Sequence, residues 1–83
     1  NIHVNFVIDR DDPAAIARAR ECVSETFKLS VELGGTISGE HGIGYVKSGY
    51  LGYALGQPTI EIMKGIKKVF DPNGILNPGK MFV

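Results

Sequence analysis

Residues 12–35, DPAAIARARECVSETFKLSVELGG, predict the longest element of the chain, an amphipathic helix. Asp12 suits the cap position because its carboxylate accepts hydrogen bonds from free N–H groups, and Pro13 suits the first helical position because its missing N–H needs no partner there. Gly34 and Gly35 supply the left-handed end. Most charged residues lie opposite a stripe of apolar side chains that recur every three or four residues: Ile16, Ala19, Val23, Phe27 and Val31.

Residues 1–8, NIHVNFVI, alternate between polar and apolar side chains, which is typical of a β-strand. Asn1, His3 and Asn5 would share one face of this strand and the apolar residues the other, because successive side chains point to opposite sides of a sheet. The pattern begins at the first residue, without Met or a polar turn, so we expect further residues before it.

The second half of the chain predicts another helix and an irregular tail. Residues 36–38 are compatible with a short strand, and the glycine-punctuated segment 45–57 with a structured loop that contains one short helical turn. Pro58 marks the start of a helix that ends at Asp71, and the residues after it hold two turn signals. The predicted fold class is therefore α+β, an antiparallel sheet with covering helices.

Composition narrows the function. A chain of 83 residues is at most one small domain with a modest core. Nine Lys and Arg balance nine Asp and Glu without a basic face, which argues against nucleic acid as a partner. The apolar runs are far shorter than a membrane span. Cys22 has no partner for an internal disulfide and is interpreted as a packing residue, so we expect a reducing compartment, cytoplasmic or membrane-peripheral.

A carboxylate and an imidazole stand side by side in residues 36–44, TISGEHGIG. The glycines around Glu40 and His41 let the backbone approach a bound molecule closely. The run lacks the lysine of a phosphate-binding P-loop and does not match the dinucleotide fingerprint. Together with His3 it offers a nitrogen and oxygen ligand set compatible with zinc, manganese or iron. From the residues alone, a metal or catalytic site and a purely structural loop both remain open.

Three stretches carry a resemblance to a known family. GGTISGEHGIG (34–44), followed by Lys47 and the Tyr50-Leu51 pair, and KKVFDPNGILNPGKMF (67–82) resemble the C-terminal part of the FAD-linked oxidases. That family includes D-lactate dehydrogenases, the glycolate oxidase D subunit and D-2-hydroxyglutarate dehydrogenase. NIHVNF at the start resembles the second half of the strand motif H-x-x-G-D-G-N-x-H-x-N of the same family.

The resemblance implies roles for five residues. His3 and Glu40 would be ligands of a divalent metal, zinc or manganese or iron. Asn5 would lie at the substrate, a small D-2-hydroxy acid such as lactate, glycolate or 2-hydroxyglutarate. His41 would be the general base that takes the hydroxyl proton while hydride passes to FAD, and Asn77 would contact the flavin.

The resemblance also implies an arrangement of domains. Residues 1–56 would be the last part of a ferredoxin-like substrate-binding cap, and residues 57–83 a helix and tail that return to an FAD-binding domain elsewhere in the same protein. The 83 residues alone would then be inactive, and a dimer that covers their apolar face is possible. The electron acceptor stays unassigned. The alternatives are an alkylglycerone-phosphate-type or cresol-type flavoenzyme and a non-catalytic metal-binding α+β module.

Overall fold

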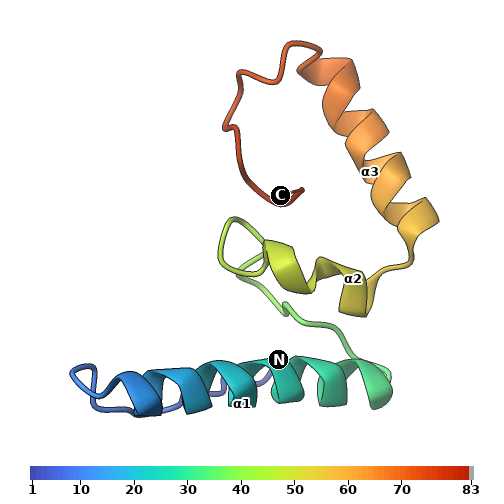
Figure 1. Ribbon diagram of the computed structural model, residues 1–83. Helices are drawn as coiled ribbons and strands as arrows, with labels where there is room; N and C mark the ends of the chain where they lie inside the picture. Colours follow the sequence, from blue (N-terminus) through green and yellow to red (C-terminus); the bar gives the residue numbers. More distant parts are fainter. Residues whose placement is uncertain (83) are drawn as a thin grey trace.

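The computed structural model describes residues 1–82, and its longest element is helix α1, Pro13–Glu32 (Figure 1). The helix begins where the sequence predicts, because the Asp12 carboxylate accepts a hydrogen bond of 2.9 Å from the N–H of Ala14. Just beyond its C-terminal end, Gly34 has a φ of 82°, a left-handed conformation that glycine adopts without steric cost. Both predicted ends of this helix are confirmed.

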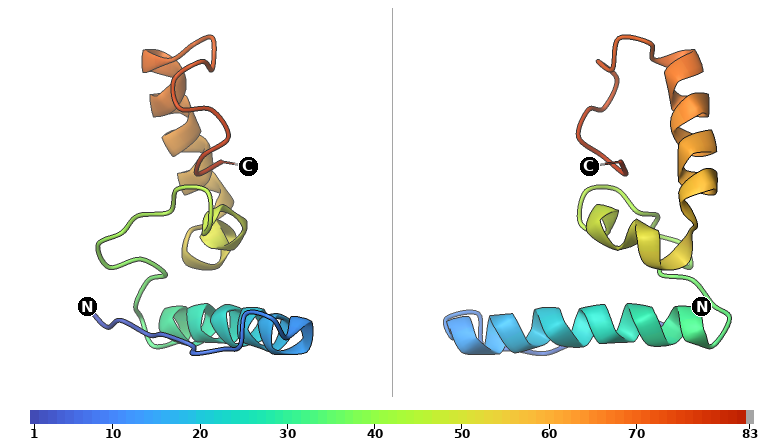
Figure 2. Two further views of the ribbon diagram at one scale, coloured as in Figure 1. Left: turned by 90° about the vertical axis from the view of Figure 1, so that its left-hand side faces the viewer. Right: turned by 45° about the vertical axis from the view of Figure 1, so that its right-hand side comes forward.

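The predicted antiparallel sheet is wrong. No β-strand occurs among residues 1–82. Residues 1–8 run back along α1 instead of along another extended segment (Figures 1 and 2). The physical reason is that residues 1–8 lie beside a helix. A strand needs a second extended segment as its hydrogen-bond partner, and the backbone N–H and C=O groups of a helix are already bonded to one another.

Residues 36–38 do not form the second predicted strand either. They lead into a turn in which the N–H of Gly42 donates to the Ser38 hydroxyl at 2.7 Å. This local side-chain contact directs the chain into a bend instead of an extended pairing. The ferredoxin-like α+β arrangement therefore does not fit, and the part of the chain described is helical with irregular connections.

Two short helical elements follow the turn, one more than predicted. They are the 3₁₀-helix η1, Ser48–Tyr50, and α2, Leu51–Ala54. Figure 1 shows α2 above the C-terminal half of α1. The ring of Tyr50 packs edge-on against Phe27 of α1, with ring centroids 4.9 Å apart. This aromatic contact joins the middle of the chain to its longest helix.

Helix α3, Gln57–Phe70, begins one residue before Pro58 and ends directly before Asp71, close to the prediction. It leads away from α2, and the tail after it turns back toward the loop that precedes η1 (Figures 1 and 2). At the end of this return the N–H of Met81 donates to the carbonyl of Gly44 at 2.6 Å. The tail thus forms a closed path with α3.

The arrangement is open. The radius of gyration is 15.0 Å, against about 12 Å for a compact domain of this length. The solvent-accessible surface is 6474 Å², against about 4,900 Å² expected for a compact monomer of this mass. Among residues 1–82 only two apolar side chains are buried, Ile37 and Leu51. No helix among these residues combines the length and the apolar character that crossing a membrane requires.

Candidate functional site

Three side chains from two segments far apart in the sequence meet at the loop of residues 39–44, which we call the glycine-rich loop. The Nε2 atom of His3 lies 2.7 Å from Oε1 of Glu40, although 37 residues separate them in the sequence. Nε2 of His41 lies 3.5 Å from the same oxygen. All three residues offer a ligating atom within 4.8 Å of the others. The structure therefore brings together the three candidate ligands named from the sequence. We refer to His3, Glu40 and His41 as the His-Glu-His cluster.

The loop geometry depends on glycine. Gly42 has a φ of 77° and Gly44 a φ of 54°, backbone conformations that residues other than glycine adopt only with strain. A side chain at position 39 would begin 2.3 Å from Oδ1 of Asn1, so Gly39 also permits the close approach of the loop to the first residue. These glycines allow the loop to place Glu40 and His41 next to His3.

The cluster is open to solvent and suited to a ligand. The side chains of His3, Glu40 and His41 are 58%, 55% and 68% exposed, so all three are accessible to a ligand from solvent. The two imidazole rings lie edge to face, with centroids 5.4 Å apart. Two imidazole nitrogens and one carboxylate oxygen form a donor set that zinc, manganese and iron accept. By this chemical test the residues present fit a divalent metal.

A cavity of about 340 Å³ adjoins the cluster, because Glu40 is also one of its lining residues. The rest of its wall comes from residues 36–39, 42 and 43 of the loop and from the apolar side chains of Leu51, Ala54, Leu55 and Met63. This volume lies within the range of small-molecule sites. Glu40 therefore belongs both to the cluster and to the wall of a space that can hold a small ligand.

The two predicted amide residues lie elsewhere. Asn5 lines a separate groove of about 540 Å³ between the first residues, α1 and residues 46–50. Asn77 is exposed in the tail, with a φ of 46°. Within residues 1–82 neither amide forms a hydrogen bond with the His-Glu-His cluster. The structure does not unite them with it.

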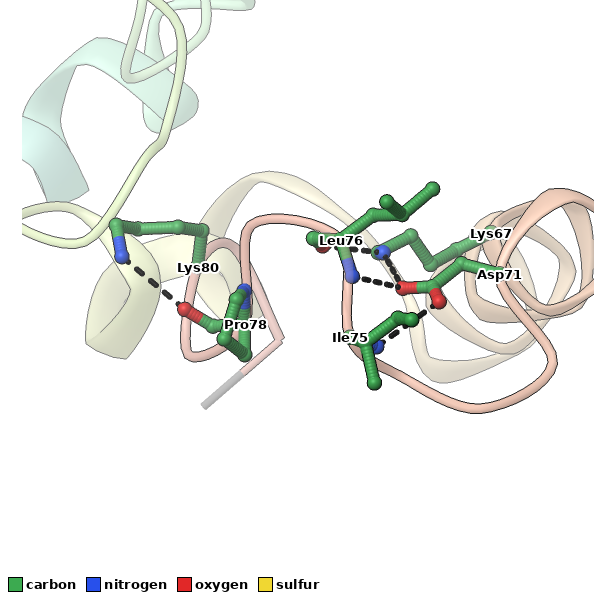
Figure 3. A network of polar contacts seen from close by, with 6 residues as sticks. All are labelled: Lys67, Asp71, Ile75, Leu76, Pro78 and Lys80. Carbon is green, nitrogen blue, oxygen red and sulfur yellow. Dashed lines mark hydrogen bonds and ion pairs between the residues drawn. The ribbon is translucent and has the colours of Figure 1, made fainter.

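A second polar centre was not predicted from the sequence. Figure 3 shows Asp71, the residue after α3, at the centre of a network that we call the tail knot. Its carboxylate accepts hydrogen bonds from the N–H groups of Ile75 at 2.9 Å and Leu76 at 3.1 Å, and it forms an ion pair with Lys67. Lys67 also donates to the carbonyl of Leu76 at 2.8 Å.

The electrostatics of the tail knot favour the ionised carboxylate. The hydrogen bond from Lys67 lowers the pKa of Asp71 below its ordinary value of 3.8, and the amides of Ile75 and Leu76 add to this effect against the desolvation that burial imposes. The sequence signal was available: a lysine four residues before an aspartate that ends a helix lies on the same helix face. The role of this Lys67–Asp71 pair depends on the turn of the tail that brings the backbone of Ile75 and Leu76 to Asp71, and the sequence pattern does not reveal that turn.

The family model for the C-terminal domain of FAD linked oxidases matches residues 1–81 of this chain. Glycolate oxidase subunit GlcD of Bacillus subtilis (strain 168) is 44% identical over 82 residues, which cover 99% of this chain and 17% of that protein. D-lactate dehydrogenase of Anaerostipes hadrus is 52% identical over 59 residues, 71% of this chain and 12% of that protein.

D-2-hydroxyglutarate dehydrogenase of Stutzerimonas stutzeri (strain A1501) is 42% identical over 87 residues, covering 99% of this chain and 18% of that protein. The chain thus spans less than a fifth of the length of each of these relatives. No solved structure matches it significantly. The family match covers almost all of the sequence, including both segments that form the cluster, and the chain belongs to the family of the C-terminal domains of FAD-linked oxidases.

Proposed function

We propose that the protein to which these residues belong oxidises a D-2-hydroxy acid to the 2-oxo acid, with FAD as the hydride acceptor and the His-Glu-His cluster at the reacting carbon. The observation that carries the proposal is the meeting of His3 with Glu40 and His41 of the glycine-rich loop, with potential ligating atoms within 4.8 Å of one another and a cavity next to Glu40. The family supports FAD. Three relatives are named for glycolate, D-lactate and D-2-hydroxyglutarate. These names support the substrate class, because each of the three acids carries a hydroxyl on the carbon next to its carboxylate.

His3 and Glu40 are the residues that would hold a divalent metal in this proposal. A zinc, manganese or iron ion bound there would supply Lewis acidity that makes the substrate hydroxyl more acidic. The carboxylate of Glu40 is exposed, and the 2.7 Å contact with His3 fixes its direction. Through such an ion, His3 and Glu40 would position the hydroxyl and carboxylate of the substrate on one side of the loop.

His41 acts as the general base. The unprotonated nitrogen of a neutral imidazole can accept the hydroxyl proton, and histidine is the commonest residue in this role. As the O–H bond breaks, its proton passes to His41 and the electron pair forms the C=O bond. The α-hydrogen leaves as hydride toward FAD, so the substrate loses two electrons and two hydrogens. Glu40, next to His41, stabilises the imidazolium that results.

The remaining predicted roles are part of the same proposal. Asn5, two residues after His3, would hydrogen-bond the substrate, and Asn77 would contact the flavin as the tail returns. Residues 1–56 would belong to the substrate-binding cap, and residues 57–83 would lead back to the flavin domain. The family supports a flavin domain in the same protein.

The test is turnover of glycolate, D-lactate and D-2-hydroxyglutarate by the intact protein with an artificial dye as electron acceptor. A His41→Gln substitution is expected to lower kcat by about 10²–10⁴-fold, the usual effect of losing a general base. The flavin absorbance spectrum should stay unchanged, which shows that the variant still binds FAD.

Tyr45→Phe is the matched control, because Tyr45 is an exposed residue in the next turn and the substitution removes only its hydroxyl. It should keep wild-type turnover. Full activity in a folded, flavin-loaded His41→Gln protein would contradict the catalytic role and favour a cluster that only binds metal.

A further inference from the structure

The tail after α3 is fixed firmly at its start. Asp71 is 6% exposed, whereas every residue from 72 to 80 is exposed. Its two carboxylate oxygens are divided between partners: Oδ1 accepts from the N–H of Ile75, and Oδ2 accepts from the N–H of Leu76 and from Lys67. Lys67 also holds the Leu76 carbonyl. The tail knot therefore sets the direction in which the chain leaves α3 (Figure 3).

The other end of the tail is fixed to the loop that carries the cluster. The N–H of Met81 donates to the carbonyl of Gly44 at 2.6 Å. Met81 has a φ of 64°, a conformation that costs free energy for any residue other than glycine and persists where the surroundings impose it. Gly44 ends the same glycine-rich loop that contains Glu40 and His41.

Little else restrains the path between these two ends. Apart from the tail knot, the only side-chain hydrogen bond among residues 1–82 that involves residues 72–80 is from Lys80 to the carbonyl of its near neighbour Pro78, at 3.1 Å. A local contact of this kind shapes a turn but does not hold the tail to the body of the structure. The position of Met81 relative to Gly44 therefore depends on the direction given at Asp71.

We propose that Asp71, with Lys67, is a positioning residue for the site: by fixing the exit of the tail from α3 it brings Met81 to Gly44 and holds the 39–44 loop in the conformation that places Glu40 and His41. The catalytic meaning of this link rests on the proposed function. The mechanical link itself rests only on the contacts at the two ends of the tail.

The charge state of Asp71 matters for this role. An asparagine at this position has one acceptor oxygen, and its NH₂ group would face either a backbone N–H or the Lys67 ammonium, both of which are donors. Asp71→Asn therefore keeps the size of the side chain and removes half of the tail knot. This substitution therefore tests the hydrogen bonds that direct the tail while leaving the packing of the side chain nearly unchanged.

The experiment is hydrogen exchange followed by mass spectrometry on the intact protein, comparing wild type with Asp71→Asn. Peptides that span 39–46 and the segment around Met81 should exchange on the order of tenfold faster, because local opening becomes more frequent. Peptides from α1 should keep their wild-type rates. Turnover of the 2-hydroxy acid substrate is measured on the same samples, and kcat should fall together with the loss of loop protection.

Glu61→Gln is the matched control. Glu61 forms an ion pair with Lys64 at 3.0 Å on the same helix, but the pair is exposed and has no contact with the tail. The control should leave exchange and turnover unchanged. A second pair of variants keeps the test decisive if Asp71→Asn does not fold: Lys67→Arg retains the donors and should preserve loop protection, and Lys67→Leu should reduce it.

Faster exchange in the tail with an unchanged 39–46 loop would overturn the proposal, because Asp71 would then act only as a cap of α3. Equal effects of Lys67→Arg and Lys67→Leu on the loop would overturn it too. The proposed function fails by a different result, the absence of 2-hydroxy acid turnover in the wild-type protein, which leaves the exchange measurement fully interpretable.

Discussion

The His-Glu-His cluster and the tail knot are built from similar groups and have opposite properties. Each centres on one carboxylate with nitrogen partners, Glu40 in the first and Asp71 in the second. Asp71 is buried, and both of its oxygens accept hydrogen bonds from the chain. Glu40 is more than half exposed, and both imidazoles approach the same oxygen, Oε1. The second oxygen of Glu40 accepts no hydrogen bond from residues 1–82.

This difference separates a carboxylate that holds the fold from one that is free for a ligand. A buried carboxylate whose two oxygens both accept hydrogen bonds from the chain stabilises the backbone around it and is shielded from an outside ligand. A carboxylate with an unused oxygen beside two imidazoles keeps that capacity. The comparison predicts different responses to substitution and to pH.

The largest effect is expected from Glu40→Ala, measured as the affinity of the intact protein for Mn²⁺ or Zn²⁺ by titration calorimetry. Loss of partners outside the ligand sphere of a metal commonly costs 10–100-fold in affinity, so loss of a ligand should cost at least about 100-fold. His3→Ala should have a comparable effect, because it removes the other proposed ligand.

Glu25→Ala is the control for this titration, since Glu25 is an exposed carboxylate on α1 outside the cluster. It should bind metal like the wild type. Equal metal affinity in Glu40→Ala and wild type would contradict the difference drawn between Glu40 and Asp71, because Glu40 would then bind metal no better than any other surface carboxylate.

A smaller effect is expected from Gly42→Ala. The left-handed conformation at Gly42 costs an L-residue roughly 1–2 kcal/mol, although the space around the position is open. Metal affinity should therefore fall by about fivefold or more, since 1.4 kcal/mol corresponds to a factor of ten. Gly49→Ala is the matched control, because Gly49 also faces open space but has no left-handed backbone. Identical affinities in the two variants would show that the loop conformation does not set the site.

The smallest effect under ordinary conditions is the pH dependence of the tail knot. The folded pKa of Asp71 lies below its ordinary value of 3.8, so its stabilisation is fully present above that value and is lost as the pH falls through the lowered folded pKa. Thermal unfolding of wild type and Asp71→Asn should therefore differ by a constant amount between pH 7 and pH 5. The difference should shrink only below about pH 4. A difference that already shrinks between pH 7 and pH 5 would contradict the assignment.

The helices were predictable because their ends are decided locally. Asp12 caps α1 through an N–H two residues away, and Pro58 and Asp71 bracket α3 within its own sequence. The sheet was wrongly predicted because residues 1–8 have the alternation of a strand, whereas strand formation depends on an extended neighbour. In this structure the neighbour is α1, and the alternating residues lie beside it unpaired.

The site was predictable only in part. The sequence identified His3, Glu40 and His41 as candidates, and their meeting needed a contact across 37 residues that the spacing alone does not imply. The family resemblance supplied that link. Asp71 was read only as the end of α3, because its partners Ile75 and Leu76 reach it through the turn of the tail.

The glycine-rich loop is held from both directions along the chain, by His3 on one side and by Met81 on the other. Each of these two contacts closes a segment of 37 residues. Closing such a segment costs an unfolded chain about 3 kcal/mol of entropy. The helix between each pair of ends, α1 for one closure and α3 for the other, fixes much of the backbone in between and so lowers the entropy that the closure has to overcome. The conformation of the loop therefore depends on both closures together, and opening either one releases the loop on that side.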